Sequence, residues 1–337
     1  MKSAASYFSV SSPLIKENIR RYWAIPAISF LVYFLSGVFP LLISYHEIDQ
    51  QYYFIESLLI NHNPFFMMAH LIVPVITAVV VFRYLQTTAS VTTMHAMPFS
   101  RAKLFNSNVL SGLILTTIPV FVTGFILLLI SKPVYNPRAM AVYTSAENSF
   151  GSSVAGAFAE PVNVFARMNI LNWMWESLII ILVIYAVAVF AGLVTGNSLM
   201  HIAAGFGFNF LIPALFGIFT LYCQQYLYGF SAGNDWGEIM LGLSPYLQVF
   251  ESGGELPWIL QILYILNALV LFAVSMYLYN KRKLEKASDA FVFSFMIPVM
   301  SYLIAFFGMT FLGFYFEAIR QIADGFVAIA GVFGVDG

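Results

Sequence analysis

The stretch WESLIIILVIYAVAVFAGLVT, residues 175–195, is apolar almost throughout, and its one charged residue is Glu176 near the start. A helix needs about 20 apolar residues to cross roughly 30 Å of hydrocarbon, so this stretch predicts a membrane span. Similar runs recur along the chain. They predict spans over residues 22–44, 64–82, 109–131, 175–195, 199–222, 257–279 and 291–314. The sequence therefore predicts an all-α fold, a polytopic transmembrane helix bundle.

The composition indicates the same class of protein. The chain is 60% hydrophobic and 9% charged, with a mean hydropathy of +0.84, whereas soluble domains are about 25% charged. The apolar runs leave no room for a sizeable soluble domain. A single cysteine, Cys223, excludes an internal disulfide and a cysteine-only metal cluster.

The Lys and Arg residues are unequally divided between the two sides of these spans. With a cytoplasmic N-terminus, eleven of the 15 fall on the cytoplasmic side, as the positive-inside rule requires. The cytoplasmic set is Lys2, Lys16, Arg20, Arg21, Arg83, Arg101, Lys103, Lys281, Arg282, Lys283 and Lys286. The outer set is Lys132, Arg138, Arg167 and Arg320. We expect a multi-pass protein of the plasma membrane with its N-terminus inside.

A basic segment, VTTMHAMPFSRAKLFNSN at residues 91–108, separates two of the spans on the cytoplasmic side. We expect the preceding helix to continue past Arg83 toward His95 and to stop at Pro98, and Ser100 to cap the next helix. Four apolar side chains of this segment would be exposed or half-exposed unless lipid headgroups or another protein covered them. They are Met94, Met97, Phe99 and Phe105. The alternative is a basic loop that rests on anionic lipid through Arg101 and Lys103.

Other segments add to this pattern. SSPLIKENIRRYW, residues 11–23, predicts an amphipathic helix at the membrane surface, with Ser12 as its N-cap and Pro13 at its first position. Only a few residues around TGNSL join the spans 175–195 and 199–222, and a long outer segment, 223–256, contains GEIMLGLSPYLQVF. This order of elements resembles the permease subunits of ABC-2 type transporters. The likeness is greatest to permeases of Gram-positive bacteria, over FRYLQTTASVTTMHAMPFSRAKLFNSNVLSGLILTTIPV, residues 82–120.

The resemblance implies an N-terminal elbow helix within residues 1–21, a type V exporter-like six-span core over 22–283, and an additional C-terminal membrane hairpin over 284–337. Many relatives continue beyond GVFGVDG, so the hairpin is expected to be incomplete. The resemblance also implies a cytoplasmic coupling helix at about residues 92–106, which docks on a separate ATPase subunit. The coupling residues so implied are Met94, His95, Met97, Pro98, Phe99, Ser100, Arg101, Lys103 and Phe105.

The expected partners are an ABC ATPase subunit that carries ATP and Mg, a second copy or a related permease, and membrane lipid, but no nucleic acid. The chain has no G-x-x-x-x-G-K-[ST] and no H-E-x-x-H, so no catalytic, cofactor-binding or metal-binding residue is predicted within it. His70 is the ionisable residue expected well inside a span, where a hydrogen bond between helices is favoured over a proton relay. Gly192 and Gly196 form a G-x-x-x-G suited to helix packing or to a dimer face.

These features together predict the permease subunit of an ATP-driven transporter that exports an amphipathic or hydrophobic substrate such as a peptide, an antibiotic or a lipid-like molecule. One alternative is an intramembrane enzyme that acts on lipid or peptide, although polar groups for catalysis are scarce in the spans. The other is a membrane anchor or sensor partner without a transport path.

Overall fold

The computed structural model describes residues 9–60, 63–96, 98–150, 162–230, 233–251, 256–282 and 289–332. These residues form helices and loops, and Tyr135 and Asn163 form an isolated antiparallel bridge. Within the described ranges, 7 helices are long and apolar enough to cross a membrane. They are Ala24–Ile43, Gln50–Val81, Arg101–Ile130, Arg167–Val194, Ser198–Tyr226, Trp258–Lys281 and Met296–Arg320. Each overlaps one predicted span, which confirms a multi-pass, all-helical membrane architecture.

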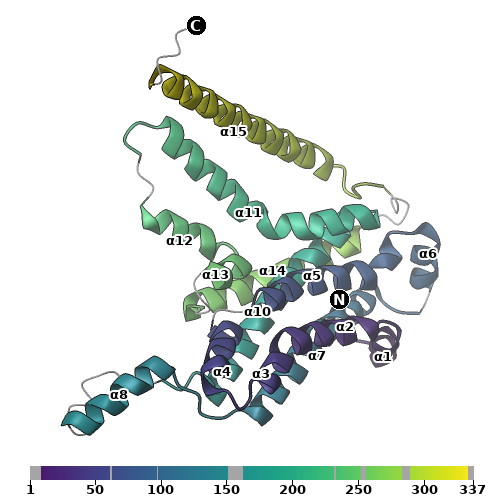
Figure 1. The fold of residues 1–337 in the computed structure, drawn as a ribbon. Coiled ribbons are helices and arrows are strands. Elements are labelled where there is room, and N and C mark those ends of the chain that lie inside the picture. The colour runs from purple at the N-terminus through teal and green to yellow at the C-terminus, as the bar shows by residue number, and fades with distance from the viewer. Residues whose placement is uncertain are drawn as a thin grey trace. The chain divides into compact units, whose positions relative to one another are not determined.

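The chain divides into two compact units, residues 1–290 and 291–337, which are described separately. The first half of unit 1 (Figure 1) contains α1 Ser12–Arg21, α2 Ala24–Tyr33, α3 Phe39–Ile43, α4 Ile48–Ile55, α5 Pro64–Val81, α6 Thr88–Ala96, α7 Arg101–Ile130 and α8 Pro137–Phe150. Its second half contains α10 Arg167–Val194, α11 Ser198–Tyr226, α12 Asn234–Gly242, α13 Pro245–Glu251 and α14 Trp258–Lys281. Two π-helical turns, Phe34–Val38 and Glu56–Ile60, and a 3₁₀ turn, Arg83–Leu85, complete unit 1.

Helix α10 is the central helix of unit 1. It contacts α5, α7, α11 and α14, and 78% of its most apolar window is buried. A helix that is apolar on all faces is expected at the core of a bundle, and the stretch 175–195 has that character. By contrast, only 17% of the corresponding window is buried in α11 and in α14. Their exposed apolar side chains suit contact with lipid or with another membrane helix.

The π-helical turn Phe34–Val38 has an identifiable packing partner. A Cβ atom added to Gly37 would lie 2.5 Å from Cζ of Phe66 on α5, which is closer than packed atoms allow. Phe66 is itself fully buried, and its ring lies edge-on to that of Tyr33, 4.9 Å away. Glycine at this turn therefore lets the first span approach α5 closely.

Within the described residues 291–332, unit 2 contains one continuous helix, α15 Met296–Val332, and the second arm of the predicted hairpin is not found there. The helix continues beyond the predicted end of the span at residue 314, because the stretch 314–326 lacks proline and contains good helix formers. An ion pair between Arg320 and Glu317, 2.9 Å apart and three residues apart in sequence, also favours the helix there.

Candidate functional site

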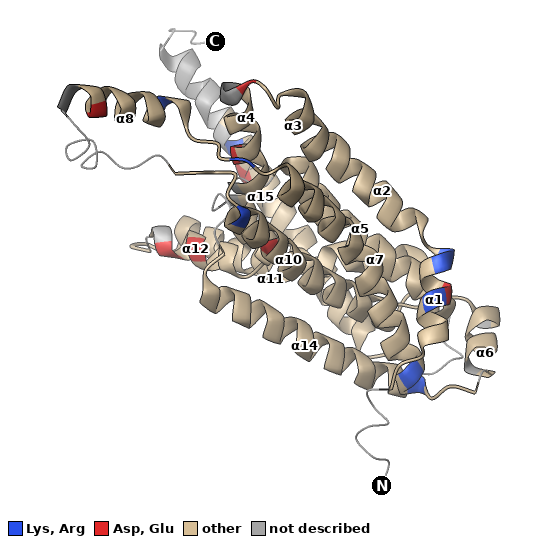
Figure 2. Ribbon diagram, turned by 90° about the horizontal axis from the view of Figure 1, so that it is seen from below, with Lys and Arg blue, Asp and Glu red and all other residues tan. Residues whose placement is uncertain are grey.

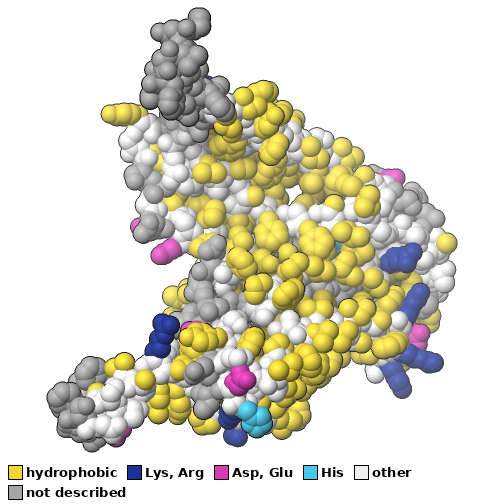
Figure 3. All heavy atoms as spheres, in the orientation of Figure 1, with side chains coloured by type: hydrophobic (Ala, Val, Ile, Leu, Met, Phe, Trp, Pro, Cys, Tyr) yellow, Lys and Arg dark blue, Asp and Glu magenta, His cyan; other side chains and the backbone are white. Residues whose placement is uncertain are grey.

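Most described cations lie at one end of unit 1, which we call the basic end. Here α5, α10 and α14 finish, α7 begins, and α1 packs along the first turns of α7. The cations of this end are Lys16, Arg20, Arg21, Arg83, Arg101, Lys103, Lys281 and Arg282. Basic side chains gather at the right of Figure 3, and Figure 2 shows them near α1 and α6. At the opposite end lie the positions of Lys132, Arg138 and Arg167, where α7 finishes and α10 begins.

The predicted continuation of the second span past Arg83 is wrong. Helix α5 ends at Val81, a 3₁₀ turn buries Tyr84 and Leu85, and the separate helix α6 follows. The break is stable because the carbonyl of Leu85 accepts a 2.8 Å hydrogen bond from Nη2 of Arg282. Helix α6 then lies at the periphery of the bundle in Figures 1 and 2. Its inward side chains are Val91, which is buried, and Met94, which is half-buried against the core.

The connection between α6 and α7 has the predicted cap. Oγ of Ser100 accepts a hydrogen bond from the backbone N–H of Lys103 at 3.2 Å, and α7 starts at Arg101. Pro98 is exposed and Phe99 is half-buried, with Nζ of Lys103 5.6 Å from the Phe99 ring centroid. Met97 and the side chain of His95 lie outside the described part of the chain.

Phe105 was predicted on the exposed surface, and the structure buries it. It is 2% exposed, and its ring lies 6.0 Å from that of Phe82 and 5.4 Å from that of Tyr279. The first turns of α7 pack against α14, where Nη1 of Arg101 donates to the carbonyl of Asn280 at 2.9 Å. Phe105 therefore belongs to the core and is not available to a partner.

Arg282 forms a three-carbonyl contact that we call the Arg282 clamp. Its Nη1 donates to the carbonyls of Gly192 at 3.0 Å and Leu193 at 2.7 Å, and its Nη2 donates to Leu85. The planar guanidinium suits several fixed acceptors at once. Burial lowers the pKa of Arg282 to about 10, so it remains charged at neutral pH. Sequence reasoning counted Arg282 only as a topological charge, because nothing in the run of basic residues 281–283 distinguishes the middle one.

A second polar network joins α11 to the same turn. Oγ of Ser198 donates to Oε1 of Gln86 at 2.6 Å, and Nε2 of Gln86 lies 2.6 Å from Nδ1 of His201. Nε2 of His201 lies 2.9 Å from the carbonyl oxygen of Ala188, which can only accept a hydrogen bond. The imidazole proton is therefore on Nε2. Neither Gln86 nor His201 was singled out as a site residue in the sequence.

The two glycines of the G-x-x-x-G pack within the chain. A Cβ on Gly192 would lie 2.3 Å from Cε1 of His201, and the N–H of Gly196 donates to the carbonyl of Ala290 at 3.4 Å. Both are buried. Within the subunit, Gly192 therefore packs against α11 and Gly196 contacts the backbone of Ala290, while a dimer face at these residues stays a prediction.

Helix α1 is fixed to α7 by amide and hydroxyl contacts. Nδ2 of Asn18 donates to Oδ1 of Asn108 at 2.8 Å and to Oγ of Ser111 at 2.9 Å. The N-cap is Ser11 and not Ser12, and the N–H of Ser11 donates to Oγ of Ser107 at 2.8 Å. A movement of the start of α7 would therefore carry α1 with it.

Elsewhere in unit 1, His70 on α5 is fully buried, with its ring 5.6 Å from that of Tyr33 on α2. Over the described residues, no three His, Cys, Asp or Glu side chains gather closely enough to hold a metal ion. The chain matches no protein-family model, and no curated protein or solved structure matches it. The chemistry of the basic end has to be inferred from its own contacts.

Proposed function

We propose that the chain is the permease subunit of an ABC-2 type transporter and that α6, with residues 98–103, forms the surface on which a separate ATPase subunit docks. The observation that carries the proposal is the mechanical connection of α6 to the spans. Gln86 and Leu85, just before α6, are bonded to His201 on α11 and to Arg282 at the end of α14. A force applied to α6 would reach both helices through these bonds.

The outer side of α6 and the connection between α6 and α7 are suited to docking of an ATPase subunit. Thr92, Thr93 and Pro98 are exposed, and Phe99 is half-buried without belonging to either core cluster of unit 1. An aromatic side chain of this kind is suited to fill a groove on a partner. Arg83 and Lys103 nearby would steer an acidic partner surface. The likeness of residues 82–120 to ABC-2 permeases points to the same partner.

In the proposed transporter, ATP and Mg bind to the ATPase subunit, and the basic end faces the cytoplasm, as the positive-inside rule requires. Closure of the ATPase pair would move α6, and the bonds of Leu85 and Gln86 would pass that movement to α10, α11 and α14. A second copy or a related permease would complete the transport path. The abundance of aromatic side chains, 17% of the chain, suits export of an amphipathic or hydrophobic substrate.

Co-purification of the chain from its native membrane with a P-loop ATPase tests this proposal. The double variant Phe99→Ala, Met97→Ala should remain folded in the membrane, because Phe99 does not belong to the core, and should recover much less of the P-loop ATPase than the wild type. Truncation of a central contact residue commonly costs about 2 kcal/mol or more of binding. The matched control is Thr92→Ala on the exposed side of α6. If the double variant recovers as much ATPase as the control and supports the same coupled hydrolysis, α6 is not the docking element.

A further inference from the structure

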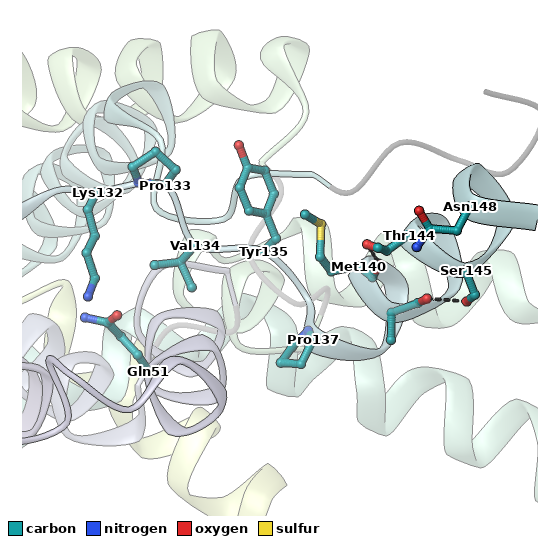
Figure 4. A pocket seen from close by; sticks show the side chains of 11 residues that line it. Gln51, Lys132, Pro133, Val134, Tyr135, Pro137, Met140, Thr144, Ser145 and Asn148 are labelled. Atoms are coloured by element: carbon teal, nitrogen blue, oxygen red, sulfur yellow. Dashed lines mark hydrogen bonds between the residues drawn. The ribbon is translucent and has the colours of Figure 1, made fainter. Parts of the chain in front are cut away.

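A second candidate site lies at the end of unit 1 opposite the basic end. A pocket of about 830 Å³ is bounded by α4, by the connection 131–136 that follows α7, and by α8. Figure 4 shows the side chains that line it, and Figures 1 and 2 show α8 extending away from the other helices. Pockets of 300–1,000 Å³ are typical of sites for small organic ligands.

Gln51 is the most unusual residue of this pocket. Its side chain is 0% exposed, and neither its amide nitrogen nor its amide oxygen has a hydrogen-bond partner among the described residues. Burial of a primary amide without partners is unfavourable, and native proteins rarely leave both ends unsatisfied. Gln51 lines the pocket, so a small movement of its side chain on binding would let a bound molecule supply the missing contacts.

Lys132 supplies a positive charge beside this amide. Figure 4 shows the ends of Lys132 and Gln51 directed toward one another. Nζ of Lys132 donates to the carbonyl of Tyr45 at 2.5 Å and lies 3.9 Å from the Tyr45 ring centroid. An ammonium group has three protons to donate, so these contacts leave donor capacity. No ion pair of Lys132 occurs with any carboxylate among the described residues.

The remainder of the pocket is mainly apolar. Val134 is buried, Pro137 and Met140 add further carbon surface, and Tyr135 and Thr144 also line the pocket. Two hydrogen-bond donors, the ammonium of Lys132 and the amide of Gln51, thus lie next to an apolar wall. A carboxylate attached to an apolar body matches this arrangement, because it accepts from both donors and neutralises the charge.

We propose that this pocket binds an amphipathic organic acid, with its carboxylate on Lys132 and Gln51 and its apolar body against Val134, Pro137 and Met140. The free carboxyl end of an apolar peptide has this chemistry. The assignment depends only on the pocket and does not require the ATPase proposal, since the two sites lie at opposite ends of α7, about 45 Å apart at 1.5 Å per residue.

The test uses the full chain in lipid nanodiscs and two small probes that differ only at the terminal group, N-acetyl-L-phenylalanine and its neutral amide. Calorimetric titration should show saturable binding of the acid and at least about tenfold weaker binding of the amide, because a hydrogen bond to a charged group contributes that much. Gln51→Leu and Lys132→Gln should each weaken binding of the acid by about tenfold or more. Gln50→Leu, the same change at the exposed neighbouring residue, should bind the acid as the wild type does.

Stability in the absence of ligand provides a second readout. Gln51→Leu should raise the thermal unfolding midpoint of the empty protein, because it replaces an unsatisfied buried amide by an apolar side chain of similar size. It should also remove the further increase that the acid produces in the wild type. Three results would each overturn the proposal: no saturable binding of the acid to the wild type, equal binding of acid and amide, or a lower unfolding midpoint of empty Gln51→Leu.

Discussion

Nη2 of Arg282 lies 2.8 Å from the carbonyl oxygen of Leu85. Arg282 directly follows α14, and its hydrogen bond stabilises the 3₁₀ turn that follows α5. The same guanidinium holds Gly192 and Leu193 at the end of α10. Three spans are thus joined at one end through backbone carbonyls. Because the acceptors are backbone atoms, the contact requires a particular side chain only at Arg282.

Replacement of Arg282 by methionine should destabilise the protein strongly. Three carbonyls would lose their donor in a buried position, and a loss of about 3 kcal/mol in the free energy of unfolding is expected. Arg282→Lys should lie between the wild type and Arg282→Met, since an ammonium retains the charge but cannot span the same acceptors. Thermal unfolding in nanodiscs measures both. The matched control is Lys281→Met, whose side chain is exposed and whose effect should stay below about 1 kcal/mol.

Gly192→Ala should destabilise unit 1 by overpacking. The new methyl group would meet the ring of His201 at 2.3 Å, and that ring is held on both sides by Gln86 and Ala188. A loss of about 1–3 kcal/mol is expected. Gly207→Ala on α11 is the control, because nothing lies within 4 Å of the added Cβ there. It should be neutral or slightly stabilising, and equal effects of the two substitutions would contradict the packing described for Gly192.

Substitution of Phe105 should lower the stability of the protein, whereas substitution of Phe99 should weaken binding of the ATPase. Phe105→Ala removes a fully packed ring from the core and should lower the free energy of unfolding by about 3–5 kcal/mol. Phe99→Ala should leave the unfolding midpoint nearly unchanged and reduce the amount of bound ATPase. The comparison requires unfolding and co-purification to be measured on the same two preparations. An unaltered unfolding midpoint of Phe105→Ala would show that its ring does not pack between Phe82 and Tyr279.

The orientation is testable with single cysteines. Cys223 is 8% exposed, so it is a poor reporter and is best replaced in Cys223→Ser. In that background Val142→Cys on α8, at an exposed position, should react with a membrane-impermeant maleimide on intact cells. Thr93→Cys on α6, also exposed, should react only after the membrane is opened. The reverse pattern would place the basic end outside the cell.

The spans could be predicted from the sequence because length and hydropathy decide membrane insertion almost without regard to neighbours. The cap at Ser100 was also predictable, since it depends on residues close in sequence. The burial of Phe105 was not predictable in this way. Its exposure depends on α14, which is more than 150 residues distant, and not on the polarity of residues 98–103.

The same limit applied to the candidate sites. The Arg282 clamp and the Gln86–His201 contact join residues far apart in sequence, and their acceptors include backbone carbonyls that carry no sequence signal. Gln51 and Lys132 likewise lie far apart in sequence, with α5 and α7 between them. The sequence does carry one indication for Lys132, because a lone cation directly after a long apolar helix often lies at the membrane–water interface.

The central place of α10 has a consequence for how the protein is made. Helices α2, α5 and α7 emerge from the ribosome before α10, yet their buried sides face it or one another around it. Until residue 194 has entered the membrane, polar side chains such as Thr77 and Thr123, both fully buried in the finished subunit, have no completed core around them. The early spans therefore lack part of their final packing during this interval of synthesis, when the incomplete bundle is open to membrane chaperones and proteases.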